Sequence, residues 1–166
     1  MKRIWIGAVI SLLLLTGCSP RTDYRDTVSC SQLAKAALQG MGDAEQYLPA
    51  DADHYDFYFG KDDAYDEVED GYVVFHRETA NVDELGIFRA DDGEDVEEVR
   101  AMVERYLEGQ VESLRSFAAN YSPRDMEKIE GAGVRVYGRY VVYYILDGED
   151  AERVLRTVER ELSEGS

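Results

Sequence analysis

Apolar residues recur every three or four positions over a long stretch in the middle of the chain, and this spacing predicts a helix. The positions are Val96, Val99, Val103, Tyr106, Leu107, Leu114 and Phe117, and the pattern runs to about Asn120. Asp92-Gly93-Glu94-Asp95 stands directly before it, where acceptors and negative charge suit the free N–H groups of a helix start. We therefore predict one long helix whose apolar stripe faces the core.

A shorter helix is predicted nearer the N-terminus. Ser29 and Gln32 have the spacing of a capping box, and Gly40 is a typical residue at a helix end. The apolar stripe between these signals comprises Cys30, Leu33, Ala34, Ala37 and Leu38. Because Cys30 belongs to the stripe, we interpret it as a buried free cysteine that packs as a small hydrophobe; a reactive or intermolecular thiol is the alternative.

Two further helices are predicted from their start signals. Ser122-Pro123 supplies an N-cap and a proline for a short helix that ends near Gly131. The last helix begins at Gly148-Glu149-Asp150. Residues 41–49 are ambiguous, and Tyr47 with Leu48 would suit the end of a helical turn.

Alternating or continuous apolar residues predict the strands. The stretches are Tyr55–Phe59, Tyr72–His76, Asp83–Ala90, Val134–Tyr137 and Tyr140–Leu146. Gly138-Arg139 suits a tight hairpin turn between the last two. The final stretch is an unbroken apolar run, as expected of a strand that is buried on both faces.

The order strand, strand, helix occurs twice. An offset of 55 places Gly93–Leu107 on Gly148–Leu162 with identity at nine of fifteen positions. Duplication of a β-β-α unit would explain this identity, and so would shared helix-start chemistry. Either way the predicted fold class is α+β, with an antiparallel sheet of about four to five strands and helices packed on one face.

The N-terminus has the pattern of an export signal. Lys2 and Arg3 precede the apolar run Ile4–Leu15, which is shorter than the roughly 20 residues that span a bilayer core. Leu15-Thr16-Gly17-Cys18 follows and resembles a bacterial lipobox, whose cysteine is acylated and becomes the mature N-terminus. We therefore expect a signal peptide over residues 1–17, a lipidated tether over 18–28 and a single domain over 29–166.

The charge of the chain limits the classes of partner. The net charge is −17, and it becomes −19 once Lys2 and Arg3 are removed, with 16 basic against 35 acidic residues. Phosphate backbones and anionic lipid headgroups should repel such a surface, so nucleic acid is excluded and the lipid on Cys18 must supply membrane attachment. The expected location is the outer face of the cytoplasmic membrane, or the outer membrane if the source is Gram-negative.

Candidate metal ligands are weak. Asp51-Ala52-Asp53, followed by His54 and Asp56, invites a calcium-loop interpretation but departs from the EF-hand pattern at Tyr55, Asp56 and Asp62. The acidic groups 62–70 and 91–95 are explained by solvated surface and helix-start charge. His54 and His76 have no nearby histidine or cysteine that would complete a zinc pattern. We expect no metal and no cofactor.

Candidate chemistry elsewhere is also limited. His76 with Arg77, Glu78 and Glu84 could form a small polar cluster at the sheet edge. Motifs of nucleophilic hydrolases, phosphate-binding loops and zinc proteases are absent, so no catalytic residue is assigned. Seven of the twelve tyrosines fall on predicted strands, where we interpret them as core or sheet residues. An exposed tyrosine face that holds a glycan or peptide is the alternative.

Several motifs together resemble a known bacterial lipoprotein family, catalogued as domain of unknown function 4358. They are Asp83-Glu84-Leu85-Gly86-Ile87-Phe88, Arg105, Gln110, Tyr121-Ser122-Pro123 and Gly138-Arg139-Tyr140-Val141-Val142. The resemblance covers roughly Tyr58 to Leu146. It implies an exported lipoprotein, often of Gram-positive bacteria, and it implies no activity and no catalytic residues.

Two functions are consistent with these observations. The first is a non-enzymatic binding or interaction module that is tethered to the membrane and contacts an envelope protein or wall component. The alternative is a hydrolase of cell-wall or extracellular polymer that uses carboxylates brought together by the fold, which requires a pocket with two carboxyl groups about 5 to 10 Å apart.

Overall fold

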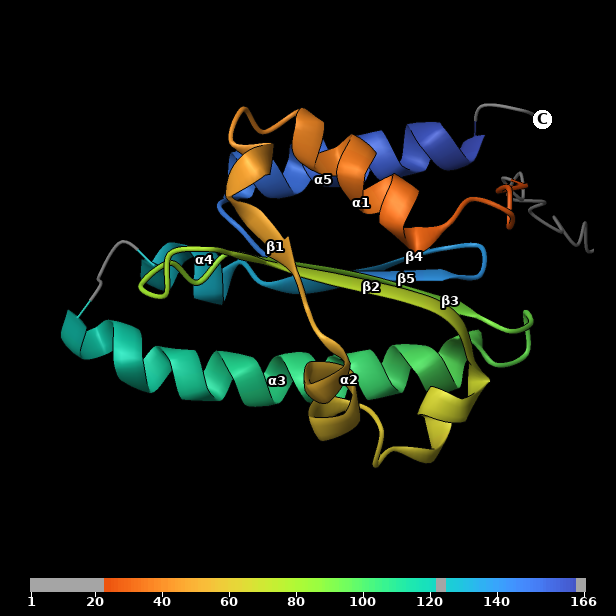
Figure 1. Cartoon of the computed structure of the whole chain (residues 1–166), viewed down its shortest axis with the longest axis horizontal. Helices are drawn as coiled ribbons and strands as arrows, with labels where there is room; N and C mark the ends of the chain where they lie inside the picture. The colour runs from red at the N-terminus through yellow and green to blue at the C-terminus, as the bar shows by residue number, and fades with distance from the viewer. Residues whose placement is uncertain (1–22, 122–124, 164–166) are drawn as a thin grey trace, which may run out of the picture.

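The computed structural model describes residues 23–121 and 125–163, and its centre is a five-stranded antiparallel sheet in the order β1-β2-β3-β5-β4 (Figure 1). The strands are β1 (Tyr47–Pro49), β2 (Val68–His76), β3 (Glu84–Ala90), β4 (Gly133–Tyr137) and β5 (Tyr140–Ile145). The helices are α1 (Cys30–Gln39), α2 (Ala52–Tyr58), α3 (Val96–Tyr121), α4 (Asp125–Glu130) and α5 (Gly148–Ser163), with short 3₁₀ turns at Ala44–Gln46 and Asp63–Glu67.

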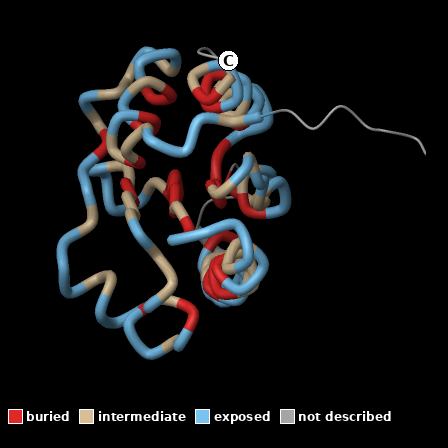
Figure 2. The backbone as a smooth tube through the Cα atoms, turned by 90° about the vertical axis from the view of Figure 1, so that its right-hand side faces the viewer, coloured by how far each residue is buried: buried red, intermediate tan, exposed pale blue. Residues whose placement is uncertain are grey.

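The predicted α+β class and the antiparallel sheet are confirmed, but helices cover both faces of the sheet rather than one (Figures 1 and 2). One core joins α1 and α5 to one face, and a second core joins α2, α3 and α4 to the other. The reason lies in β5, where every residue from Tyr140 to Ile145 is buried. A strand that is apolar on both faces needs cover on both.

Most predicted elements are confirmed. Ser29 and Gln32 form both hydrogen bonds of a capping box at the start of α1. The long helix, the three strands around Tyr72–His76, Asp83–Ala90 and Tyr140–Leu146, and the final helix are present, as is the hairpin turn, where Gly138 has a φ of +58°. The short helix is α4; the Ser122-Pro123 pair expected to start it lies outside the described residues.

The strand predicted over Tyr55–Phe59 is wrong, because this segment is the helix α2. The Asp51 carboxylate accepts a hydrogen bond from the backbone N–H of His54 at 3.0 Å, which is the N-cap interaction that starts a helix. The ambiguous stretch 41–49 ends not in a helical turn but in β1, a three-residue edge strand paired with β2.

The two β-β-α units do not repeat in space. A rotation that carries β3 onto its antiparallel neighbour β5 would leave the following helices on the same face of the sheet. Instead, α3 packs in one core and α5 in the other, on opposite faces. The identity between Gly93–Leu107 and Gly148–Leu162 is therefore better explained by shared helix-start chemistry than by a duplicated unit.

The chain joins the domain before its first helix. The backbone N–H of Arg25 donates to the carbonyl of Leu162 at 2.9 Å, and the carbonyl of Val28 accepts from the Tyr140 hydroxyl at 2.7 Å. The expected signal peptide and Cys18 lie outside the described residues. Within the described part of the chain, none of the helices combines the length and apolar character needed to cross a membrane.

Candidate functional site

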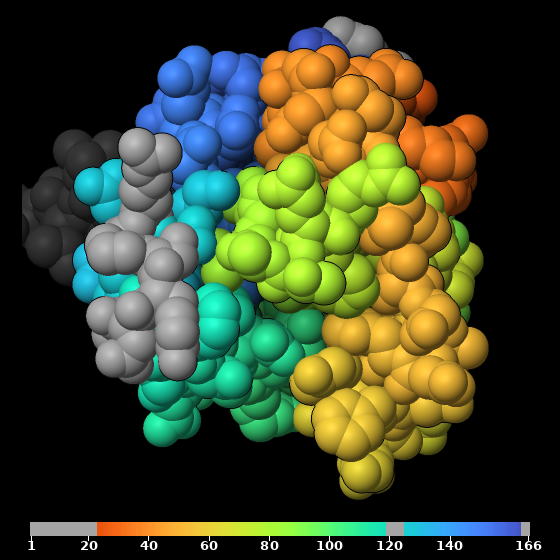
Figure 3. All heavy atoms as spheres, turned by 60° about the vertical axis from the view of Figure 1, so that its left-hand side comes forward, coloured from red at the N-terminus to blue at the C-terminus, as the bar shows by residue number. Residues whose placement is uncertain are grey.

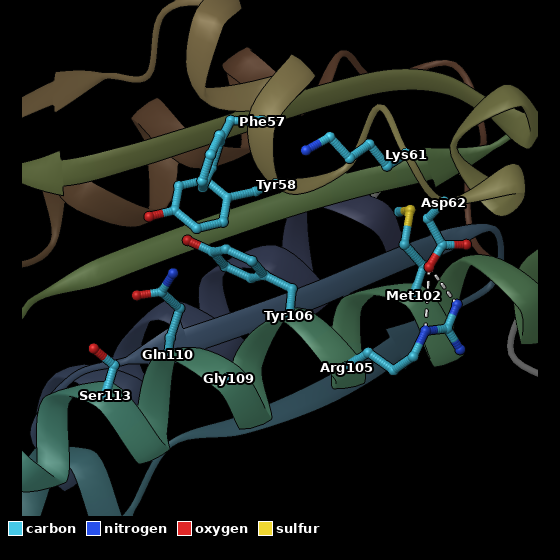
Figure 4. A pocket seen from close by; sticks show the side chains of 10 residues that line it. All are labelled: Phe57, Tyr58, Lys61, Asp62, Met102, Arg105, Tyr106, Gly109, Gln110 and Ser113. Atoms are coloured by element: carbon cyan, nitrogen blue, oxygen red, sulfur yellow. Dashed lines mark hydrogen bonds and ion pairs between the residues drawn. The ribbon is translucent and has the colours of Figure 1, made fainter.

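A groove of about 550 Å³ lies between the α2 segment and the α3 helix, which are neighbours on the face shown in Figure 3. We call it the α2–α3 groove. Ten residues line it, as Figure 4 shows: Phe57, Tyr58, Lys61, Asp62, Met102, Arg105, Tyr106, Gly109, Gln110 and Ser113. Its volume falls within the roughly 300 to 1,000 Å³ that is typical of small-ligand sites.

Two aromatic side chains attach the α2 side of the groove to the rest of the domain. The Tyr55 hydroxyl accepts a hydrogen bond from the backbone N–H of Val73 at 2.8 Å, and Phe59 is fully buried. These two side chains hold one face of the α2 segment against the domain. The face that carries Phe57 and Tyr58 therefore points toward solvent. Phe57 is 65% exposed and Tyr58 is 45% exposed, although both are large apolar rings.

The α3 side of the groove is a stripe of residues at helical spacing. Gly109 and Gln110 lie three and four residues after Tyr106, and Ser113 lies four and three residues after them, so the four residues share one face of the helix (Figure 4). A Cβ atom added at Gly109 would have nothing within 4 Å. Glycine inside a helix costs about 0.5 to 1 kcal/mol relative to alanine, and no packing contact requires it here. Its effect is to keep the groove open.

Charged groups occupy one end of the groove and neutral polar groups the other (Figure 4). The Arg105 guanidinium donates to Asp62 Oδ2 from Nε at 3.1 Å and from Nη2 at 2.5 Å. The Lys61 ammonium lies 5.3 Å from the centre of the Phe57 ring, and within residues 23–121 and 125–163 no carboxylate forms a salt bridge with it. Gln110 and Ser113 lie at the opposite end.

A buried carboxylate lies behind the groove. Glu84 Oε1 accepts hydrogen bonds from the hydroxyls of Tyr106 at 2.6 Å and Tyr143 at 2.5 Å. Burial raises the pKa of Glu84, and the two tyrosine hydrogen bonds oppose that shift. A Cβ at Gly86 would lie 2.0 Å from the Tyr143 ring, so only glycine lets this ring cross β3 and reach Glu84.

His54 forms part of the wall behind Tyr58. Its ring centre lies 4.6 Å from that of Tyr58 and 4.8 Å from that of Phe75. Burial lowers the pKa of His54, and its Nε2 is buried with no hydrogen-bond partner among the described residues. A neutral imidazole held among aromatic rings is a packing residue and not the ligand of a calcium loop.

The acidic candidates serve as helix caps and ion-pair partners. Asp51 caps α2, and Asp62 is bound by Arg105. Asp92 Oδ1 accepts from the backbone N–H groups of Glu94 at 2.6 Å and Asp95 at 3.3 Å, as expected before a helix. Among the residues that the structure describes, no three His, Cys, Asp or Glu side chains are grouped as a metal site requires.

The polar cluster expected around His76 is not assembled. The Nδ1 of His76 accepts from the backbone N–H of Glu78 at 3.2 Å, but Glu84 is buried on the α3 face with the tyrosines. Its neighbour Asp83 is buried instead between Lys128, whose ammonium lies 2.5 Å away, and the hydroxyl of Tyr47 at 3.2 Å. No local pattern in the sequence indicates that Asp83 is a second buried carboxylate.

The interpretation of Cys30 is confirmed, and the interpretation of the tyrosines as core residues is confirmed for those of β5. It is wrong for Tyr58, which lies on α2 and is 45% exposed. Cys30 is fully buried, its thiol donates to the carbonyl of Asp70 at 3.4 Å, and burial raises its pKa, so it is not a reactive thiolate. Tyr140 and Tyr143 are fully buried in the two cores. Because helices cover both faces of the sheet, the alternative of an exposed tyrosine face on the sheet itself is wrong.

Sequence reasoning missed the α2–α3 groove because α2 was expected to be a strand. One signal could have indicated it. Gly109 interrupts a long helical pattern at a position outside the apolar stripe, where no turn or cap needs glycine. Two residues that carry the family resemblance, Arg105 and Gln110, line the groove as well.

Comparisons with known proteins give one match. A family model described as "Domain of unknown function (DUF4358)" matches residues 61–146. This span includes the α3 side of the groove, Glu84 and the strands β2 to β5. No curated protein and no solved structure matches significantly.

Proposed function

This chain belongs to the DUF4358 family, and from that premise we propose that it is a lipid-anchored binding module of the cell envelope that holds its ligand in the α2–α3 groove. It is a non-enzymatic module in this proposal. The ligand belongs to a neighbouring envelope protein or wall component.

The observation that carries the proposal is the open position at Gly109. An exposed glycine in the interior of α3 costs helix stability, and no packing contact compensates. What the missing side chain provides is space beside Tyr106 and opposite Phe57 and Tyr58 (Figure 4). Exposed aromatic rings around such a space are typical of binding sites.

The expected attachment would hold the domain close to the membrane. Cys18 lies seven residues before Arg25, where the chain is first bonded to the domain, and seven extended residues span at most about 25 Å. The described chain begins beside the α1 and α5 layer, whereas α2 and α3 lie on the other side of the sheet (Figure 1). The groove is lined from the α2 segment and α3, so it lies on that other side as well. The groove therefore suits a ligand that approaches the domain from the side opposite the α1 and α5 layer.

The geometry gives less support to the hydrolase alternative. The α2–α3 groove has one lining carboxylate, Asp62, and that group is bound by Arg105. A cavity of about 270 Å³ beside α1 has none, and a cavity of about 400 Å³ near Arg25 has only Glu161. Within the described residues these cavities lack the two carboxyl groups that acid–base hydrolysis needs.

The proposal is tested by crosslinking in intact cells. A photo-crosslinking phenylalanine analogue replaces Phe57, which is exposed at the groove, or Val136, which is 40% exposed on the edge strand β4. We expect the Phe57 site to give a defined crosslinked product, and we expect Gly109→Leu in the same chain to remove it. Leucine fills the groove and favours a helix more than glycine does.

Two controls separate ligand exclusion from misfolding. Gly109→Leu should leave the free energy of unfolding unchanged or higher, as measured by urea denaturation, because the position is open. Products formed from the Val136 site should not change with Gly109→Leu. A Phe57 product that persists when the groove is filled would contradict the proposal.

A further inference from the structure

The α2–α3 groove carries positive charge on a strongly acidic chain. The whole sequence has 35 acidic and 18 basic residues, yet the groove is lined by Lys61 and Arg105 against a single carboxylate, Asp62. Asp62 is bound by Arg105, so Lys61 supplies the remaining charge. Its contact with the Phe57 ring at 5.3 Å is a weak one at an exposed site. The ammonium is therefore able to bind an anionic group of a ligand.

The net charge of the chain limits how much negative charge this ligand carries. A polyanion that approaches the groove meets the field of a protein with a net charge of −17. A ligand with one carboxylate and otherwise neutral groups gains the contact with Lys61 and avoids most of that repulsion. Acidic polysaccharides are disfavoured for the same reason.

The middle of the groove suits an apolar side chain. The rings of Phe57 and Tyr58 meet edge to face, with centres 4.8 Å apart and planes at 84°, and Tyr58 meets Tyr106 at 5.3 Å and 77°. Rings set at such angles form the walls of a trough. A sugar would instead need one flat, open ring face on which to stack.

The far end of the groove suits a peptide main chain. Gln110 has an amide that both donates and accepts, and the Ser113 hydroxyl does the same one turn further along α3. These groups match the N–H and C=O groups of a peptide bond. A simple aliphatic acid has no group to pair with them.

We propose that the α2–α3 groove binds the C-terminal end of an apolar peptide. Lys61 binds the terminal carboxylate, the aromatic trough holds the last side chain, and Gln110 with Ser113 binds the preceding peptide groups. This inference rests on the proposed function and deepens it by naming the chemistry of the ligand.

The experiment uses the whole mature chain without its lipid and a pool of N-acetylated pentapeptides that end in Leu, Val, Phe or Tyr. Each peptide is prepared as the free acid and as the C-terminal amide. We expect the acids to bind, as detected by saturation-transfer NMR and titrated by calorimetry, and the amides to bind more weakly. Lys61→Gln should weaken binding of the acids by a factor of about three to ten and leave the amides unchanged.

Lys35→Gln is the matched control, because Lys35 is exposed on α1 across the sheet from the groove. It should have no effect, whereas Gly109→Leu should remove binding of acid and amide alike. Equal binding of acids and amides, an unchanged affinity in Lys61→Gln, no binding by any peptide of the pool at millimolar concentration, or equally tight binding of decanoate would each overturn the inference. If peptides fail while Gly109→Leu still removes the Phe57 crosslink, the groove remains the binding site and only the ligand class is wrong.

Discussion

Glu84 is the residue that links the groove to the core. The Tyr106 ring lines the groove while its hydroxyl bonds Glu84, and the Tyr143 hydroxyl bonds the same carboxylate oxygen from β5. Both tyrosine pKa values are raised by burial, so both hydroxyls keep their protons and act as donors. Tyr106 therefore joins the lining of the groove to a buried carboxyl group whose pKa is raised.

Glu84→Gln should change how stability depends on pH. The raised pKa means that the folded state holds a proton on Glu84 at pH values where the unfolded chain has released it. Wild-type stability should therefore fall as pH rises from the usual carboxyl value of 4.5 toward the raised pKa, by up to about 1.4 kcal/mol per pH unit. Glutamine does not titrate and so lacks this loss.

The measurement is urea denaturation of both proteins between pH 4 and pH 8. The wild-type chain has many other carboxylates, but these are shared, so the difference between the two curves isolates Glu84. As pH rises, the free energy of unfolding of the variant should increase relative to that of the wild-type protein. If the two stability curves run parallel across this pH range, the pKa of Glu84 is not raised in the folded state.

At the scale of elements, α2 decides whether the groove exists. Its sequence alternates aromatic and polar residues as a strand does, but the Asp51 cap and the burial of Phe59 make it a helix. The segment follows the three-residue strand β1, so β2 continues beyond its edge partner. The Val73 carbonyl accepts from Ala50 N–H at 2.9 Å, and the Val73 N–H is left for the Tyr55 hydroxyl.

Tyr55→Phe should loosen α2 against the sheet. The substitution keeps the ring and removes the acceptor for the Val73 N–H, which should cost about 1 to 3 kcal/mol in the free energy of unfolding. Hydrogen exchange should show faster exchange of the Val73 amide and of α2. Tyr65→Phe is the control, because the Tyr65 ring stacks on Phe59 and its hydroxyl has no hydrogen-bond partner in the described chain. Equal effects of the two variants would rule out the anchoring role of Tyr55.

At the scale of the whole molecule, the start of the described chain is held at one end of the sheet. Arg139 donates to the carbonyls of Ala90 at 2.9 Å and Asp26 at 3.2 Å, and Arg89 donates to the carbonyl of Val28 at 3.2 Å. The last residues of the expected tether are thus bonded to the domain from Arg25 onward. A lipid on Cys18 would hold the domain close to the membrane and in a restricted orientation.

Cys18→Ala should release the protein from the membrane. The chain is acidic, with a net charge of −17, so its surface offers no electrostatic attraction to anionic lipids that could replace an acyl anchor. Cell fractionation followed by immunoblotting should find the wild-type protein with membranes and the variant in the soluble fractions. Retention of the variant in the membrane fraction would exclude the lipobox interpretation.

The sequence by itself determined the elements whose signals are local. The period of α3, the capping box of α1, the apolar run of β5 and the hairpin at Gly138 each depend on residues within a few positions of one another, and each prediction is confirmed. The α+β class follows from the order of these elements, and the buried state of Cys30 follows from its place on the α1 stripe.

Only the tertiary structure decided the arrangement of the candidate site. The groove arises where Phe57 to Asp62 meets Met102 to Ser113, and the acid behind it is paired with hydroxyls from α3 and β5. Contacts between such distant segments depend on how the layers pack, which leaves no period or cap in the local sequence. Packing of this kind decided three features that the local sequence does not show. They are the helices on both faces of the sheet, the helical state of α2 and the role of Gly109.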